Sequence, residues 1–390
     1  MNSPIRERHR PLVHLISGLG SGGAENFLLK LLGADPQLQA ASQVISIRPV
    51  DDLSPQFEAL GVPVMRLPLG AHPAALINLF RLIRALAHPD VKLIQSWLYF
   101  SDTMAALVGR LLLKKPVIWG IRSSHAGSGK WMTSFLAQRL NPALSRQLAS
   151  AIVCCGRKAR ESHAALGYAK HQLIVIPNGY DTAHVGRNAA AGARVRDELG
   201  VGSEEFLVGM AARVTIYKDH ETLYRAIAIA RTQIPCLRLL LCGNGTGPDT
   251  TKMAAHLARH GLMDIALPLG LRRDMNAIYS AIDLHILSSL TEGFPNVVAE
   301  SVLCGCGSIS TDVGDASEIL HDTRWLVPPK MPELLAAKIL EYYRLSPLER
   351  MTVLRENKAW VEDHFEMSRV AKQYCNLYRS IAPEALDPVE

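Results

Sequence analysis

Short apolar runs alternate with longer amphipathic stretches along most of the chain. Runs of strand length lie at residues 11–16, 43–47, 62–67, 93–95, 116–121 and 151–155, and stretches of helical period lie at 74–87 and 102–113. An apolar run of this length predicts a buried strand, and the longer period predicts a helix that covers it. The alternation therefore predicts an α/β protein with parallel, doubly wound sheets.

The same pattern resumes in the second half of the chain, with strand-like runs from 206, at 237–242, at 266–270 and at 282–287. Between the halves, QLIVIPNGYD at 172–181 is a strand closed by a proline and an Asn-Gly turn. A chain of 390 residues is too long for one hydrophobic core. We therefore expect two domains.

Composition narrows the class of protein. No apolar run reaches membrane-spanning length, and the short, interrupted amino-terminal run lacks the features of a signal peptide. The 7 cysteines are odd in number and form no C-x-x-C pair, which favours reduced thiols in the cytosol and no metal site.

Charge is distributed unevenly. Residues 1–180 carry 20 Lys and Arg against 9 Asp and Glu, whereas the remainder carries 22 against 27. A basic first half suggests that one face meets an anionic partner, and we favour an anionic membrane surface. Nucleic acid is disfavoured because no motif combines aromatic and basic residues.

The stretch AIDLHILSSLTEGFPNVVAES, at 281–301, holds the most informative chemistry. Its pattern predicts a strand, a turn at Gly293, and a helix with Pro295 at its first position. Glu292 then lies where ligands bind open α/β sheets, and Glu300 lies one turn into the helix. Carboxylates accept hydrogen bonds from sugar hydroxyls, and a helix amino terminus suits a phosphate.

The sequence that surrounds these two glutamates resembles that of a known protein family. GLRRDM, AIYSAIDLHILSS, EGFPNVVAES and STDVGDASEIL, between 270 and 320, closely resemble the carboxyl-terminal signature of glycosyltransferase family 4. Members of this family are retaining enzymes of the glycosyltransferase group 1 type. This sequence resembles the members that act in the synthesis of bacterial cell-surface polysaccharides. The resemblance implies the GT-B fold, two Rossmann-like domains facing across a cleft. It implies an acceptor domain at 1–180, a nucleotide-sugar domain at 181–365, and a closing helix at 366–390 that crosses back. Ser317 departs from the family, which commonly has proline there.

The resemblance also assigns roles within the second domain. Arg213 and Lys218 match the cations that bind the donor diphosphate, and Glu300 and Glu292 would hold ribose and sugar hydroxyls. The sequence has no metal-binding D-x-D motif, so fixed cations would stabilise the leaving group. The other residues implied to bind donor are Gly243, Leu271, Arg272, Gly293, Phe294, Pro295 and Asn296.

Two loops in the first domain contain candidate site residues. Gly22 and Gly23 match the family's GGAE-type loop, which faces the donor. Arg122 could pair with a phosphate, and His125 could contact the donor sugar or an acceptor hydroxyl, although a loop histidine without a role is equally open. A dinucleotide fingerprint is the rival, disfavoured because the glycines do not form G-x-G-x-x-G and no ribose-binding acid ends the next strand.

One helix leaves a choice open. KWMTSFLAQRLNPALSRQL, at 130–148, repeats leucines at i+4, which suits a core-facing helix or, given its basic residues, a lipid interface. We favour the core-facing interpretation and expect Pro142 to break or kink the helix.

Together these observations predict a metal-independent, retaining hexosyltransferase without a cofactor. It would use a nucleotide-diphosphate sugar, preferably a UDP-sugar, and a glycan or lipid-linked acceptor of polysaccharide or lipopolysaccharide synthesis. We expect it in the cytoplasm, at the inner face of the membrane. The alternatives are a non-catalytic GT-B protein that binds nucleotide sugar or acts as a scaffold, a GT-B epimerase, and an NAD enzyme.

Overall fold

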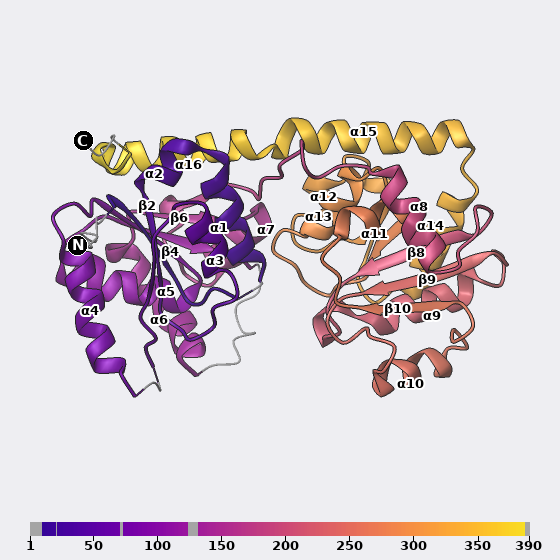
Figure 1. The fold of residues 1–390 in the computed structure, drawn as a ribbon, viewed down its shortest axis with the longest axis horizontal. Coiled ribbons are helices and arrows are strands. Elements are labelled where there is room, and N and C mark those ends of the chain that lie inside the picture. The colour runs from indigo at the N-terminus through magenta and orange to yellow at the C-terminus, as the bar shows by residue number, and fades with distance from the viewer. Residues whose placement is uncertain (1–9, 21, 71–72, 124–131, 387–390) are drawn as a thin grey trace, which may run out of the picture. The chain divides into compact units, whose positions relative to one another are not determined.

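The chain folds into two compact units. The structure is a computed structural model that describes residues 10–20, 22–70, 73–123 and 132–386. Unit 1 comprises the chain up to Gly179 and from Met367 onward, and unit 2 comprises Tyr180–Glu366 (Figure 1). Within the described residues no helix is both long and apolar enough to cross a membrane.

Unit 1 is built on a parallel sheet of seven strands in the order β3-β2-β1-β4-β5-β6-β7. The strands are β1 (Leu12–Ile16), β2 (Ser42–Ser46), β3 (Val64–Arg66), β4 (Leu93–Trp97), β5 (Val117–Ile121), β6 (Ala151–Cys154) and β7 (Leu173–Val175). The helices are α1 (Gly23–Ala34), α2 (Pro36–Ala41), α3 (Ser54–Ala59), α4 (Ala75–Ala87), α5 (Tyr99–Met104), the π-helix η1 (Ala105–Leu112), α6 (Met132–Leu148), α7 (Arg157–Ala165) and α16 (Met367–Ile381), with short turns η2 (Lys170–Gln172) and η5 (Pro383–Ala385).

Unit 2 repeats this plan with six parallel strands in the order β10-β9-β8-β11-β12-β13. The strands are β8 (Phe206–Ala211), β9 (Leu237–Cys242), β10 (Ala266–Gly270), β11 (Leu284–Leu287), β12 (Gly307–Thr311) and β13 (Leu326–Val327). The helices are α8 (Ala189–Glu198), η3 (Ile216–Lys218), α9 (His220–Ala230), α10 (Thr251–Arg259), α11 (Met275–Ala281), α12 (Asn296–Leu303), α13 (Ala316–Ile319), η4 (Thr323–Trp325), α14 (Pro332–Tyr343) and α15 (Pro347–Phe365). The predicted parallel, doubly wound sheets are confirmed.

Each sheet is covered on both faces, as its buried strands require. In unit 1 the strand order reverses after β3, and right-handed crossovers therefore place α1 and α3 on one face and α4 to α7 on the other. In unit 2, α8 packs beside α11, and α9 packs beside α14. The helices leave the two ends of the strands uncovered, and the connecting loops lie there.

The carboxyl-terminal helix α16 completes the core of unit 1. Figure 1 shows α16 beside α1 and α2, and α16 contacts α1 directly. Tyr374 is fully buried, with its ring centroid 6.1 Å from those of both Trp97 and Phe27. Residues far apart in the sequence thus form one aromatic cluster on a single face of the sheet.

Buried polar side chains tie the strands of unit 1 together. Asp102 accepts hydrogen bonds from Ser96 Oγ at 2.7 Å and from the backbone N–H of Gly120 at 3.3 Å. Burial raises the pKa of the Asp102 carboxyl to about 8. Asp102 lies in the first turn of α5, and its side chain joins this helix to β4 and β5.

His14 on β1 is held in its neutral form by its partners. Trp97 Nε1, which can only donate, donates to His14 Nδ1 at 3.2 Å, so the ring proton lies on Nε2, 3.0 Å from Ser42 Oγ. Burial lowers the pKa of His14 to about 3. Protonating His14 would break the bond to Trp97 and place a charge in the core.

We expect Tyr374→Ala to reduce the free energy of unfolding by about 3–5 kcal/mol, because it removes a large buried ring. Tyr374→Phe should cost no more than about 1 kcal/mol, since the hydroxyl lies 3.5 Å from Arg122 Nη1, a long hydrogen bond. Urea unfolding followed by circular dichroism measures both. Equal losses in the two variants would contradict the packing role.

We also expect His14 to make stability depend on pH. An unfolded histidine binds a proton near its ordinary pKa of about 6.5, whereas folded His14 does not until about pH 3. The unfolded state therefore binds more protons between these values, and the free energy of unfolding falls as pH is lowered through this window. Urea unfolding should show a shallower dependence on pH for His14→Gln than for the unaltered protein.

Asp102 titrates with the opposite sign in this window but is common to both proteins, so the comparison isolates His14. If His14→Gln does not fold, the ring-proton resonances of His14 serve instead. A shift of those resonances with a midpoint near the ordinary histidine pKa would contradict the assignment.

Candidate active site

The predicted chemistry of unit 2 gathers at the carboxyl edge of its sheet. Arg213 and Lys218 follow β8, and Glu292 follows β11, the neighbouring strand. Because the two strands are parallel, their following loops lie at the same edge, where open α/β sheets bind ligands. The strand prediction at 282–287 is confirmed as β11, which begins two residues later.

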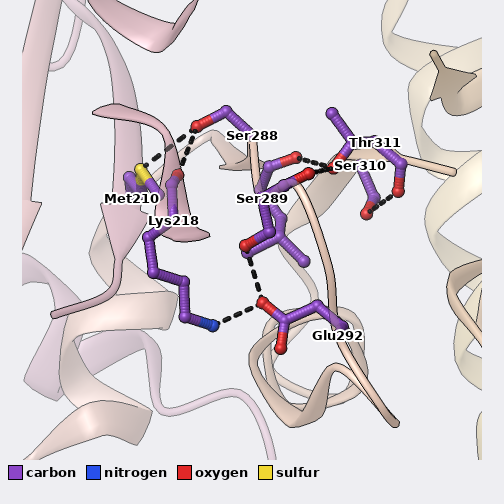
Figure 2. Close-up of polar contacts among 8 residues, drawn as sticks. Met210, Lys218, Ser288, Ser289, Glu292, Ser310 and Thr311 are labelled. Carbon is purple, nitrogen blue, oxygen red and sulfur yellow. Dashed lines mark hydrogen bonds and ion pairs between the residues drawn. The ribbon is translucent and has the colours of Figure 1, made fainter. Parts of the chain in front are cut away.

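Lys218 and Glu292 are directly paired at this edge. The Lys218 ammonium donates to Glu292 Oε1, and the side chains are only 22% and 15% exposed (Figure 2). Ser289 Oγ donates to the same carboxylate oxygen at 2.6 Å. The ammonium has three N–H groups and uses one of them in the bond to Glu292. The other two can still donate to phosphate oxygens.

Hydroxyl groups close to the pair fix the loops that carry it. Ser288 Oγ donates to the backbone carbonyls of Lys218 and Asp219, at 3.1 Å and 3.0 Å. Thr311 Oγ1, at the end of β12, donates to the carbonyl of Ser289 at 2.7 Å. Figure 2 shows these hydroxyls between the loops. The sequence alone assigned no role to these hydroxyl groups. The available signal was their position at strand ends, with Ser289 three residues before Glu292 and Thr311 three residues before Gly314.

The loop after β12 packs against the backbone of the Glu292 loop. Gly314 has a φ of +54°, and a Cβ there would lie 2.5 Å from the carbonyl oxygen of Gly293 and 2.7 Å from that of Glu292. The N–H of Asp315 donates to the Gly293 carbonyl at 3.1 Å. Only glycine permits this close approach, so Gly314 fixes the backbone that carries Glu292.

Gly243 has an equivalent function where β8, β9 and β10 end. Its φ is +137°, and a Cβ would lie 2.3 Å from the carbonyl oxygen of Ala212. Its N–H donates to the carbonyl of Gly270 at 2.8 Å. The predicted donor residue Gly243 therefore holds three strand ends together, whatever else its backbone contacts.

The start of α12 presents backbone more than side chains. The helix begins at Asn296, so Pro295 is its cap and not its first residue, which corrects the predicted start. Phe294 packs edge-on against Phe365, with ring centroids 5.2 Å apart, and Tyr180 donates to Asn296 Oδ1 at 2.8 Å. These side chains are engaged within unit 2. What remains for a ligand is the N–H groups and positive end of the helix.

Glu300, one turn into α12, is half-buried near Tyr279. Burial first, and the Glu300 carboxylate second, raise the pKa of the Tyr279 hydroxyl well above its usual value. Tyr279 is therefore neutral, and the negative charge at this place belongs to Glu300.

The fixed positive charge at the edge comes from Lys218 and Arg213. Arg213 is exposed, and its guanidinium has no ion-pair partner in the described ranges. Burial, and next the charge of Lys218, lower the pKa values of His220 and His285 to about 4 and about 3. Both histidines are therefore neutral near pH 7. Asp219 caps α9 by accepting from the N–H of Thr222 at 3.3 Å.

The segment after β10 divides between exposed and engaged side chains. Leu271 is 72% exposed. Arg272 donates to Asp274 at 2.7 Å and to Glu198 at 2.8 Å, and these bonds raise its pKa. Asp274 precedes α11 and is the ion-pair partner of Arg272, and its side chain makes no capping hydrogen bond to that helix. Because Arg272 is engaged, the backbone is what this segment offers to a ligand.

In unit 1, the candidate residues lie at helix and strand ends. Gly22 caps α1, and Gly23 is its first residue. Arg122 follows β5, with its guanidinium 4.1 Å from the ring centroid of Phe27 and its Nη2 donating to Asn178 Oδ1. Arg122 is therefore held by its own unit. His125 lies outside the described residues.

No group of three or more metal-binding side chains occurs in the part of the chain that the structure describes.

Comparisons with known proteins agree with this arrangement. The sequence model for "Glycosyl transferase 4-like domain" matches residues 15–179, and that for "Glycosyl transferases group 1" matches residues 205–344. The first match lies in unit 1, and the second covers the edge described above.

Individual relatives carry glycosyltransferase names. The chain is 23% identical to EpsF of Bacillus subtilis over 320 residues, covering 79% of this chain and 80% of EpsF. It is 30% identical to the D-inositol 3-phosphate glycosyltransferase of Salinispora arenicola over 164 residues, 39% of this chain and 37% of that protein.

A solved structure shows the same fold. HepE of Anabaena, in complex with UDP and glucose, superposes with a TM-score of 0.82 at 20% identity, covering 95% of this chain and all of HepE. The GT-B fold expected from the sequence is therefore confirmed.

We expect Gly314→Ala to disturb the Glu292 loop, because its Cβ would meet two backbone oxygens at a positive φ. The strain should cost about 1–3 kcal/mol of stability and lower the melting temperature. Gly186→Ala is the matched control, since a Cβ at Gly186 meets nothing within 4 Å and its φ is not positive. If the two variants melt alike, Gly314 does not have this role.

Proposed function

Since this chain belongs to the group 1 glycosyltransferases, we propose that it transfers a sugar from a nucleoside-diphosphate sugar bound at the carboxyl edge of the unit 2 sheet. The observation that carries this proposal is the paired Lys218 and Glu292 at that edge. The pair places a cation and a carboxylate side by side, which matches a donor made of a diphosphate and a polyol.

The donor's departing diphosphate would be stabilised by fixed positive charge. The proposal assigns this role to Arg213, which is exposed, and to Lys218, whose remaining N–H groups would donate to phosphate oxygens. The amino terminus of α12 would add backbone N–H groups. Such preorganised charges act where negative charge develops in the transition state. In this mechanism no metal ion is needed.

Hydroxyl groups of the donor would be held by the two glutamates. Glu292, oriented by Ser289, would accept from hydroxyls of the sugar, and Glu300 would accept from the ribose. The acceptor hydroxyl would attack the sugar on the same face from which the leaving group departs. A phosphate oxygen of the donor would take the proton of that hydroxyl. The anomeric configuration would then be retained, so the enzyme would be a retaining hexosyltransferase.

Uridine diphosphate is the proposed nucleotide, in accordance with the UDP and glucose bound to HepE. The proposed acceptor carries negative charge, because residues 1–180 hold 20 basic against 9 acidic residues. A lipid-linked glycan of cell-surface polysaccharide or lipopolysaccharide synthesis fits this charge, and the reaction would then take place at the cytoplasmic face of the membrane. A soluble molecule that carries a phosphate group is the other acceptor with negative charge. The name of the Salinispora relative, D-inositol 3-phosphate glycosyltransferase, contains such a molecule.

The first test is thermal stabilisation by a panel of nucleoside diphosphates and their sugars, with and without EDTA. A ligand of the folded state raises the melting temperature with its affinity and concentration. We expect a shift with UDP and a UDP-sugar that survives EDTA and is lost in Glu300→Ala. No shift with any nucleotide would overturn the proposal, and a shift with NAD alone would favour a dehydrogenase.

We expect Lys218→Ala to lower kcat by about 10²–10³-fold with UDP-sugar, since one stabilising charge is removed from the transition state. Lys218→Arg should recover part of this loss. Lys338→Ala is the matched control, because Lys338 forms a similar pair with Glu341, 2.7 Å apart, on α14. Release of UDP in the presence of acceptor measures all three. Near-normal turnover of Lys218→Ala would remove Lys218 from the mechanism.

A further inference from the structure

The helix α6 turns its large apolar side chains away from the core of unit 1. Phe135, Leu136 and Leu140 are each about half exposed, with Leu140 at 52%. The buried face instead carries Asn141, which donates to the carbonyl of Tyr99 at 3.0 Å, and Ser145. The core-facing interpretation of the leucine repeat is therefore wrong for its first half. Pro142 lies within the helix, which continues through it.

The neighbouring π-helix η1 shows the same orientation. Leu111 and Leu112 are exposed, Leu111 to 62%, whereas Ala106 and Gly109 face the sheet. A Cβ at Gly109 would lie 2.6 Å from Ile94 Cδ1, so a larger residue would require that side chain on β4 to shift. In η1 the small residues pack against the sheet and the leucines lie on the outside. The exposed leucines therefore do not belong to the core of unit 1.

A third element, α4, extends this surface. Leu76, Ile77 and Phe80 are exposed, with Phe80 at 67%. α4 and α6 each contact η1, and all three lie on the face of the sheet that right-handed crossovers assign to them. We call the outer surface of these three elements the α4–η1–α6 face. Monomeric proteins rarely leave so many large apolar side chains exposed together without a partner.

The charge around this face is almost entirely positive. Residues 73–148 hold 10 Lys and Arg against 2 Asp. Of these acids Asp102 is fully buried, and Asp90 lies 3.4 Å from His88. The exposed cations on the three elements are Arg81, Arg84, Arg110, Arg139 and Arg146, and in the described ranges none of them forms an ion pair.

One of these cations shows how charge and apolar surface are combined. The Arg139 guanidinium lies 5.0 Å from the ring centroid of Phe135, one turn earlier on α6. An arginine above an exposed aromatic ring places a cation at the depth where lipid phosphates meet acyl chains. Both side chains lie on the outer side of the helix.

We propose that the α4–η1–α6 face binds the surface of a bilayer that contains anionic phospholipids. Exposed phenylalanine and leucine would enter the interface, and the arginines would meet lipid phosphates. Charge complementarity selects this occupant, because α4, η1 and α6 carry five exposed arginines and no acidic residue. The inference deepens the proposed function, since it identifies the surface by which the enzyme would reach a lipid-linked acceptor.

The test is flotation of the purified full chain with vesicles of phosphatidylcholine, alone or with phosphatidylglycerol. We expect binding to the anionic vesicles that weakens as salt is raised. Leu111→Asp with Leu140→Asp should reduce the bound fraction at least about tenfold, because acidic groups would enter an anionic interface. Arg110→Ala with Arg139→Ala should weaken binding by about fivefold for each cation removed.

The matched control is Leu348→Asp with Met351→Asp, which replaces two equally exposed apolar residues on α15 in unit 2. It should float as well as the unaltered protein, and circular dichroism should report the same fold for every variant. Absence of the unaltered protein from anionic vesicles, or equal flotation of the Leu111 and Leu140 double variant, would overturn the proposal. Specific capture by an acidic protein without vesicle binding would do the same.

These outcomes are separable from failure of the proposed function, because flotation uses neither donor nor acceptor. Stabilisation by UDP without vesicle binding would overturn the membrane surface alone. Vesicle binding without stabilisation by any nucleotide would overturn the transferase proposal alone.

Discussion

The ion pair between Lys218 and Glu292 is the interaction on which the candidate site depends. It joins the loops that follow two neighbouring strands, and both side chains are largely withdrawn from solvent. Further hydrogen bonds help to offset the desolvation of such a pair, and Ser289 donates one to Glu292. The pair thus holds a cation at the sheet edge while keeping donor groups for a ligand.

The backbone around the pair is fixed by close contacts that allow no side chain. Gly314 lies against the carbonyls of Gly293 and Glu292, and Gly243 lies against the carbonyl of Ala212. Together with the hydroxyls of Ser288 and Thr311, these contacts set the positions of the loops before any ligand is bound. Preorganisation of this kind is what electrostatic stabilisation of a leaving group requires.

Positive charge recurs in both units, in different settings. In unit 2 two cations, Arg213 and Lys218, lie at the carboxyl edge of the sheet. In unit 1 the five arginines of the α4–η1–α6 face lie among exposed leucines and phenylalanines. The first setting suits one compact anion. The second suits an extended anionic surface, because the arginines are spread over α4, η1 and α6.

The sequence by itself determined the elements and the chemistry at their ends. The strands that begin at residues 206 and 237 were predictable because buried parallel strands are short, continuous apolar runs. The motif around Glu292 was recognisable because glycine, proline and acidic residues have to stand at fixed positions in a strand–turn–helix connection. Asp219 could be predicted as a cap for the same local reason.

Only the tertiary structure decided which neighbours each side chain meets. The pairing of Lys218 with Glu292 and the use of Ser289 and Thr311 depend on strands that are distant in sequence but adjacent in the sheet. The leucines of α6 follow a period that fits a core or an interface equally, because periodicity reveals a face but not what it meets. Packing answered that question: a neighbouring helix accepts the small face of α6 and leaves the large one outside.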